Sequence, residues 1–224
     1  MRNLMQKFDT RTPIAAVLAV PAGRVRIIAA DRPDTTVEVR PADAGKARDE
    51  KAAEQTTIAY ADGVLRIAVP TENQLLGPSG SIEVTIQLPT GSRIEATAGA
   101  AEFRAVGRLG DVTFEGAHGE IKVDEAASLR LTAHVGNVLI GRLDGPAEIS
   151  VQKGDINVAE ATRGPVVLRT EAGDVTIRAA AGVSATMDAG TSYGRIINEL
   201  RNTGEAQLEI RATTAYGDIT AHSL

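Results

Sequence analysis

The chain has 224 residues, of which 43% are hydrophobic and only 3% aromatic, with 22 glycines and no cysteine. The absence of cysteine excludes disulfides, thiol catalysis and a zinc–cysteine site. The formal net charge is -5 and no run of basic residues occurs, which argues against a nucleic-acid partner. With so few aromatics, the core must be built from Ala, Val, Ile and Leu, and it must be thin and regular.

The N-terminal stretch from Thr12 to Gly23 is uncharged and follows basic residues, as the apolar part of a signal peptide does. However, Asp9 lies in what would be the positive region, and Pro13 and Pro21 bracket the stretch. Its length is also below the roughly 20 residues that a helix needs to span a bilayer. We therefore expect an ordinary first strand, no membrane span and a cytoplasmic protein.

Residues 1–90 contain strand-like runs of uneven spacing. The runs are "AAVLAV", "GRVRIIAA", "TTVEVRP", "TTIAYA", "GVLRIAV" and "SIEVTIQL". Most alternate apolar and polar residues, which predicts half-buried strands. The segment Asp43–Gln55 breaks this pattern, and it favours either a short helix capped by Asp43 or a mobile loop. Thr71–Ser81 is a loop by its Gly, Pro and Ser content; it contains "GPSGS", a very weak phosphate-binding signal without a lysine.

Residues 91–224 repeat a glycine, a polar residue and two apolar residues two positions apart. The copies begin Gly110-Asp111-Val112, Gly119-Glu120-Ile121, Gly136-Asn137-Val138, Gly154-Asp155-Ile156, Gly173-Asp174-Val175 and Gly217-Asp218-Ile219, with a weaker Gly194-Arg195-Ile196. From Gly119 onward the steps are 17, 18, 19, 21 and 23 residues. A second set of glycine-led strands lies between them: "GPAEISV", "GPVVLRT", "GVSATM" and "GEAQLEI". Self-similarity at such a period indicates a solenoid.

The repeat has a direct physical reading. Glycine allows a tight bend with positive φ, and residues two apart on a strand point to the same face. Stacked coils then lie about 4.8 Å apart and exchange backbone hydrogen bonds. We predict an all-β, β-helix-like solenoid over 91–224, with two short strands per coil of about 18 residues. An irregular β segment over 1–90 precedes it, and the two form a single domain, 1–224.

The same pattern predicts which side chains fill the solenoid. One wall comprises Val112, Phe114, Ile121, Val123, Val138, Ile140, Ile156, Val158, Val175 and Ile177. The side chains expected to face it are Leu129, Leu131, Ile149, Val151, Leu168, Leu208 and Ile210.

The polar residues after the glycines form a predicted surface column at the corners of the coils. Its members are Asp111, Glu120, Asn137, Asp155, Asp174 and Asp218. A cation ladder is one interpretation, since calcium takes carboxylate oxygens. Ordinary turn chemistry is the other. Unit charges about 4.8 Å apart in water repel by only about 0.9 kcal/mol, so the column needs no metal. Asn137 and Arg195 also dilute the charge, and we expect no metal site.

We find no catalytic constellation. The sequence has no Gly-x-Ser-x-Gly, no phosphate loop ending in Gly-Lys-Ser/Thr and no His-Glu-x-x-His. The histidines, His118, His134 and His222, are scattered, and no carboxylate pair stands out. Six Phe and Tyr are also few for an aromatic platform that binds sugars. We predict no catalytic residues and no cofactor.

Nearly the whole chain resembles a large bacterial family of unknown function labelled "putative adhesin", the toastrack-like DUF4097 type. The similar stretches are "GRVRIIAADRPDTTVEVRPAD", "AAEQTTIAYADGVLRI", the "GD[IV]" series, "SYGRIINEL" and "EIRATTAYGDIT". The resemblance implies a β-solenoid of two-strand coils with an N-terminal β segment. It implies no catalytic residues.

The leading functional hypothesis is a non-enzymatic scaffold that presents a binding surface to a protein partner. An exported, glycan-binding adhesin and a polysaccharide-active β-helix enzyme are the alternatives. Self-association is a further expectation because a solenoid ends in open β-edges, which pair unless covered. "SYGRIINELRNTG" has the longer spacing of a cap, so we expect a capped monomer or dimer and not a filament.

Overall fold

The structure, a computed structural model, describes residues 4–70 and 80–224. The chain divides into two compact units, Met1–Gly119 and Glu120–Leu224. Of the loop predicted over Thr71–Ser81, residues 71–79 lie outside the described residues. In the described part of the chain, every helix is too short or too polar to cross a bilayer.

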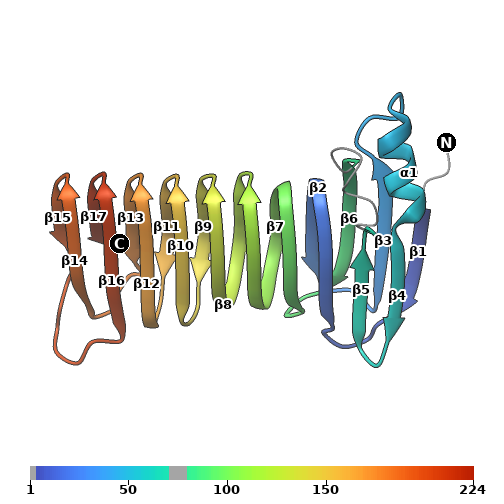
Figure 1. Cartoon of the computed structure of the whole chain (residues 1–224). Coiled ribbons are helices and arrows are strands. Elements are labelled where there is room, and N and C mark those ends of the chain that lie inside the picture. Colours follow the sequence, from blue (N-terminus) through green and yellow to red (C-terminus); the bar gives the residue numbers. More distant parts are fainter. Residues whose placement is uncertain (1–3, 71–79) are drawn as a thin grey trace. The chain divides into compact units, whose positions relative to one another are not determined.

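The first unit contains the irregular β segment and two long strands, β2 and β7 (Figure 1). Its strands are β1 (Leu4–Asp9), β2 (Ala15–Ala30), β3 (Asp34–Pro41), β4 (Thr57–Ala61), β5 (Val64–Ala68), β6 (Ile82–Pro89) and β7 (Arg93–His118). Strands β2 and β7 run parallel, while β5 and β6 pair with the first and second halves of β2. Strands β3 and β4 add antiparallel to β6 and β5, and β1 adds to β3. The strands predicted from alternation are confirmed.

A helix, α1 (Ala47–Gln55), forms in the segment for which a helix and a loop were both open. The prediction that Asp43 caps it is wrong, because Lys46 is the N-cap residue and no side chain caps the helix. The Asp43 carboxylate instead accepts the Gly45 N–H at 2.9 Å and lies 3.2 Å from the Lys46 ammonium. The Gly45 N–H, followed by Lys46, lowers the pKa of Asp43. The carboxylate therefore closes the turn before the helix.

The second unit is a two-sided solenoid. Its strands are β8 (Ile121–Val135), β9 (Val138–Leu143), β10 (Ala147–Lys153), β11 (Ile156–Ala161), β12 (Gly164–Ala172), β13 (Val175–Ala179), β14 (Ala185–Tyr193), β15 (Ile196–Glu199), β16 (Leu208–Tyr216) and β17 (Ile219–Ser223). The first sheet has the order β8–β10–β12–β16–β14, and the second sheet has the order β8–β9–β11–β13–β17–β15. Both sheets are parallel throughout, and β8 bends so that each half joins a different sheet.

The last coil of the chain is not the last coil in space. Strand β16 lies between β12 and β14, and β17 lies between β13 and β15 (Figure 1). The chain thus skips one coil position after β13 and returns to fill it. This detour explains the longest repeat steps, 21 and 23 residues, because skipping a coil means crossing about 9.6 Å instead of about 4.8 Å.

The predicted core is confirmed in full, since every side chain assigned to either wall is at most 3% exposed. Small residues such as Ala161, Ala212 and Thr170 are also buried in the second unit, but the largest buried side chains between its two sheets are Val, Ile and Leu. Burying each such side chain stabilises the fold by about 1.5–3 kcal/mol. The narrow gap between the two sheets suits side chains of this size, which explains why the sequence has only three Phe and no Trp.

The repeated glycines are required by the close approach of successive coils at one corner. Gly173 has φ +154°, and a Cβ there would lie 2.1 Å from the carbonyl oxygen of Gly154. Gly217 repeats this contact against Gly173, with a would-be distance of 2.0 Å. A side chain is therefore excluded both by the backbone conformation and by the neighbouring coil.

Leu168→Ala should cost about 2–5 kcal/mol of unfolding free energy, because the side chain is fully buried between the sheets. The adjacent Arg169 points outward, so Arg169→Ala should change it by less than about 0.5 kcal/mol. Urea unfolding followed by circular dichroism measures both. Equal losses would contradict the inward and outward assignment along β12.

Candidate functional site

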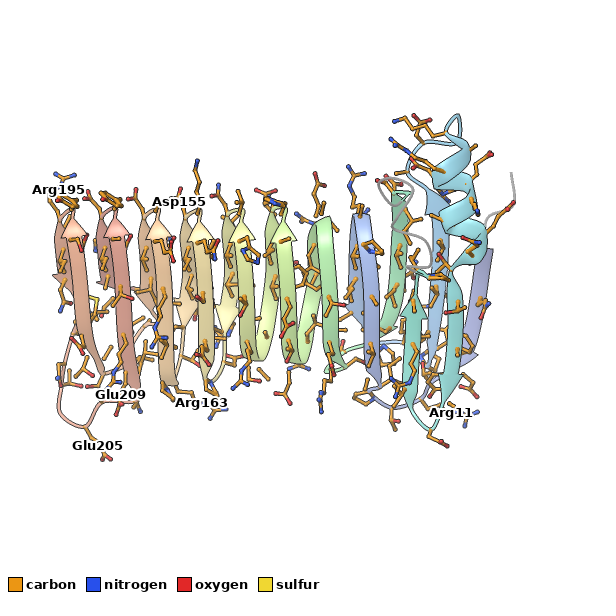
Figure 2. All side chains as sticks on the ribbon, viewed as in Figure 1. Arg11, Asp155, Arg163, Arg195, Glu205 and Glu209 are labelled. Carbon is orange, nitrogen blue, oxygen red and sulfur yellow. The ribbon has the colours of Figure 1, made fainter. Side chains whose placement is uncertain are left out.

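The predicted corner column contains a continuous series of hydrogen bonds between coils. Each acceptor is a side-chain Oδ1, and each donor is the backbone N–H of the equivalent residue in the next coil. The bonds run from Asp155 N–H to Asn137 (3.0 Å), Asp174 N–H to Asp155 (2.9 Å), Asp218 N–H to Asp174 (2.8 Å) and Arg195 N–H to Asp218 (2.8 Å). We call these five residues the corner ladder. Figure 2 labels Asp155 and Arg195 at this end of the strands.

The ladder explains why an acidic residue follows the glycine. The N–H at this bend would otherwise lack a partner, and a short side chain with an oxygen supplies one. Asn137 performs the same task as Asp155 and Asp174. The position therefore demands an acceptor and not a negative charge, which favours the turn-chemistry interpretation of the column.

A second series of bonds crosses the same corner, and sequence reasoning missed it. Thr170 Oγ1 donates to the Gly154 carbonyl at 2.9 Å, and Thr214 Oγ1 donates to the Gly173 carbonyl at 3.0 Å. Thr191 does the same to Gly217 at 3.0 Å. Each threonine stands three residues before a repeat glycine, so the signal was a Thr-x-x-Gly pattern in the last three coils.

Two members of the predicted column are not among the residues of the corner ladder. Glu120 precedes Ile121, which pairs in register with Val138, but its carboxylate contacts Lys122 Nζ at 2.9 Å. Asp111 belongs to the first unit and follows Gly110, which lies against Gly91. In the same unit Gly119 lies against Ala101 and not against Gly91, so Gly110 and Gly119 belong to different bends.

The ladder ends in a cation. Arg195 donates from Nε and Nη2 to Asp218 Oδ2, at 3.2 and 2.7 Å, in addition to the backbone bond. The guanidinium hydrogen bond, followed by the backbone N–H, lowers the pKa of Asp218. The same hydrogen bond raises the pKa of Arg195. Arg195, the departure from the acidic pattern, thus neutralises the carboxylate beside it.

Within residues 4–70 and 80–224, no group of three or more His, Cys, Asp or Glu is placed to hold a metal ion. His134 Nδ1 lies 3.1 Å from Gln152 Oε1, and His222 Nδ1 lies 2.9 Å from Glu199 Oε2. Both contacts connect neighbouring coils, while His118 ends β7.

The two sheets of the second unit present different outer surfaces. On the second sheet, register aligns four uncharged side chains, Leu139, Asn157, Thr176 and Thr220, on neighbouring coils. We call them the uncharged row. Beside it runs a second row, in which Glu125, Arg142, Glu160 and Arg178 alternate in charge and are followed by His222 and Glu199. We call it the charged row. The outer surface of the first sheet mixes uncharged side chains, such as Thr132, Ser150 and Thr213, with charged ones. The charged ones include Arg130, Glu148, Arg169, Arg211 and Asp188.

Comparison with known protein families gives one assignment. The family model described as Toastrack DUF4097 matches residues 78–220, which is more than half of the chain. The chain belongs to this family. Its β-solenoid fold and the resemblance expected from the "GD[IV]" series are therefore confirmed.

Three solved structures are similar to the chain but share little of its sequence. A "putative adhesin" from Bacteroides fragilis is 13% identical, with 98% of this chain and 97% of that chain covered and a TM-score of 0.50. A "putative adhesin" from Parabacteroides distasonis is 14% identical, covers 100% and 97%, and has a TM-score of 0.47. A "putative lipid binding protein" from that organism is 10% identical, covers 96% of both, and has a TM-score of 0.41. No curated protein matches the chain.

Asp174→Ala should cost about 1 kcal/mol of unfolding free energy, because it removes the acceptor of the Asp218 N–H. Asp174→Asn keeps an Oδ1 and should change this free energy by less than about 0.5 kcal/mol. Equilibrium unfolding in urea distinguishes the two. A loss in the Asn variant equal to that in the Ala variant would show that charge, not the acceptor, matters.

The Asp218 carboxylate should contribute to the pH dependence of stability. Since its folded-state pKa is lowered, its stabilising contribution is complete above the unfolded-state pKa of about 3.9. It is lost as the pH falls through the lower folded-state pKa. Asp218→Asn should therefore lose less stability than the wild type when the pH falls below about 4. Unfolding midpoints measured across this range test this; parallel curves would contradict it.

Proposed function

We propose that the chain is a non-enzymatic scaffold whose solenoid presents a binding surface to a protein partner. The observation that carries this proposal is the uncharged row on the second sheet. Its side chains come from strands that repeat about every 4.8 Å, and they are all partly exposed. A flat array of this kind offers many contacts at fixed spacing without a pocket.

The surroundings of the row match the anatomy of a protein–protein interface. Such interfaces have a centre depleted of charge and a polar rim. Here the charged row borders one side of the uncharged row. Arg142 pairs with Glu160 within the charged row, and it also pairs with Asp144. The corner ladder borders the other side. The outer surface of the first sheet, on which charged and uncharged side chains are mixed, has the character of an ordinary solvated face.

An exported, glycan-binding adhesin is the second candidate. The Bacteroides fragilis structure of this fold is described as a "putative adhesin", which favours surface binding of some kind. We propose a cytoplasmic location instead, because most of the uncharged stretch that resembles a signal peptide contributes to strand β2. Cell fractionation with N-terminal sequencing separates the two: an intact Met1 in the cytosol supports our proposal, and a processed N-terminus outside the cell supports the adhesin.

The absence of cysteine allows site-directed cross-linking from chosen faces. Thr176→Cys places a photoreactive maleimide in the uncharged row on β13, and Arg169→Cys places it on the opposite face, on β12. Irradiation in lysate of the source cell should cross-link one protein from Thr176→Cys and not from Arg169→Cys. With that protein purified, Thr176→Arg should weaken binding by about tenfold or more, which corresponds to about 1.4 kcal/mol.

Equal cross-linking from both faces would contradict the assignment of the binding surface. Saturable binding of glycans that Thr176→Arg does not alter would favour the adhesin. Turnover of a polysaccharide by the purified chain would replace the scaffold proposal with an enzyme.

A further inference from the structure

The outer coil of the second unit has an open edge. In the described part of the chain, β14 pairs with β16 alone and β15 pairs with β17 alone. Neighbouring residues of a strand in a parallel sheet direct their backbone groups to opposite sides. The Arg195 carbonyl accepts the Ile219 N–H at 2.8 Å, so the backbone of Arg195 faces β17. By alternation, Ile196 and Asn198 direct their N–H and C=O groups away from the solenoid.

This edge is also apolar. Tyr193, Ile196 and Ile197 are 68%, 45% and 39% exposed, and all three belong to the β14–β15 coil. Tyr216 on the neighbouring coil is 61% exposed and stacks on Tyr193, with ring centroids 5.1 Å apart and planes 2° from parallel. An edge that combines unpaired backbone groups with exposed large apolar side chains pairs readily with another strand. The spacing that suggested a cap therefore marks the coil that is itself uncovered.

We propose that this edge binds a second copy of the chain about a two-fold axis that crosses β15 at Ile197. The sequence of the edge, Arg195-Ile-Ile-Asn-Glu199, is complementary to itself when read antiparallel. Pairing about Ile197 sets Arg195 opposite Glu199 of the second copy, and the reverse. Opposite charges facing each other across antiparallel strands stabilise the pair.

The backbone agrees with this register. Pairing about Ile197 also sets Ile196 opposite Asn198 of the second copy. These are the residues whose N–H and C=O groups point outward, and two such residues exchange both hydrogen bonds in an antiparallel pair. Ile197 meets Ile197 of the second copy at the axis, so the exposed side chain at the centre is covered.

The same axis suits β14. Thr191 and Ile197 are each three residues from the Gly194 bend, so the axis that crosses β15 at Ile197 crosses β14 at Thr191. Asp188 then lies opposite Gly194 of the second copy, beside its Arg195, and no like charges are opposed. A two-fold contact uses the same patch on both copies and is closed. Dimer formation therefore covers the open edge of both copies. The dimer proposal does not depend on the protein partner proposed above.

The mass of the purified chain in solution tests the dimer directly. Light scattering after size exclusion should give twice the chain mass of 23.4 kDa, with no larger species as concentration rises. Ile197→Lys places two ammonium groups at the axis and should raise the dissociation constant by more than about tenfold. Leu139→Lys, a matched change on the same outer surface four coils away, should remain dimeric.

A charge exchange tests the register. Arg195→Glu alone and Glu199→Arg alone should each weaken the dimer, since each opposes like charges across the axis. Mixed in equal amounts, the two variants should form a heterodimer, because every opposed pair again attracts. Circular dichroism and thermal unfolding establish whether each variant is folded. If a charge variant is not folded, the comparison of Ile197→Lys with Leu139→Lys tests the proposal instead.

Three results would overturn the proposal. They are a wild type with the mass of a single chain at all concentrations, growth of the wild type to polydisperse species, and an Ile197→Lys variant as dimeric as Leu139→Lys. None of these would bear on cross-linking from Thr176→Cys.

Discussion

The constraint on which the second unit depends is the need to satisfy backbone groups at a bend that interrupts every coil. The bend brings glycines of neighbouring coils too close for any side chain. The next residue then gives its N–H to an oxygen of the adjacent coil, and a threonine gives its hydroxyl to the glycine carbonyl. These bonds fix how coils stack, and the stacking in turn aligns the side chains into rows on both outer surfaces.

The architecture was predictable because its causes are local. Alternation with a period of two identifies the inward side chains of each strand, and the glycine marks each bend. Every side chain assigned to the interior is therefore buried, although the buried Leu143, Val166 and Ile219 were not among those assigned. The order of the coils was not predictable. The copies at Gly173, Gly194 and Gly217 share the Thr-x-x-Gly pattern, which does not specify which coil lies next to which, and only the longer steps record the detour. The predicted Asp43 cap was wrong because a nearby turn N–H competed for its carboxylate.

The candidate site shows a similar limit. The corner residues were identified from spacing, but their role as hydrogen-bond acceptors depends on which coil lies next to which. The uncharged row and the charged row beside it join residues of neighbouring coils that are 17 to 19 apart in the chain up to β13. The residues are 44 apart between β13 and β17, and 23 apart between β17 and β15. Neither row exists as a sequence motif. The open edge of β14 and β15 likewise follows from the coil order, since a chain stacked in sequence order would end in β16 and β17.

The two proposals concern separate surfaces of this chain: a face that repeats with the coils and an edge that ends them. Both proposals require that the corner ladder exists in solution and holds β16–β17 between β12–β13 and β14–β15. Amide hydrogen exchange measured by NMR tests this most directly. Asp155, Asp174 and Arg195 are exposed residues, yet their amides should exchange far more slowly than those of the unstructured chain, and as slowly as strand amides. Exchange of these three amides at the rate of an unstructured peptide, with protected strands on either side, would contradict the ladder and the coil order built on it.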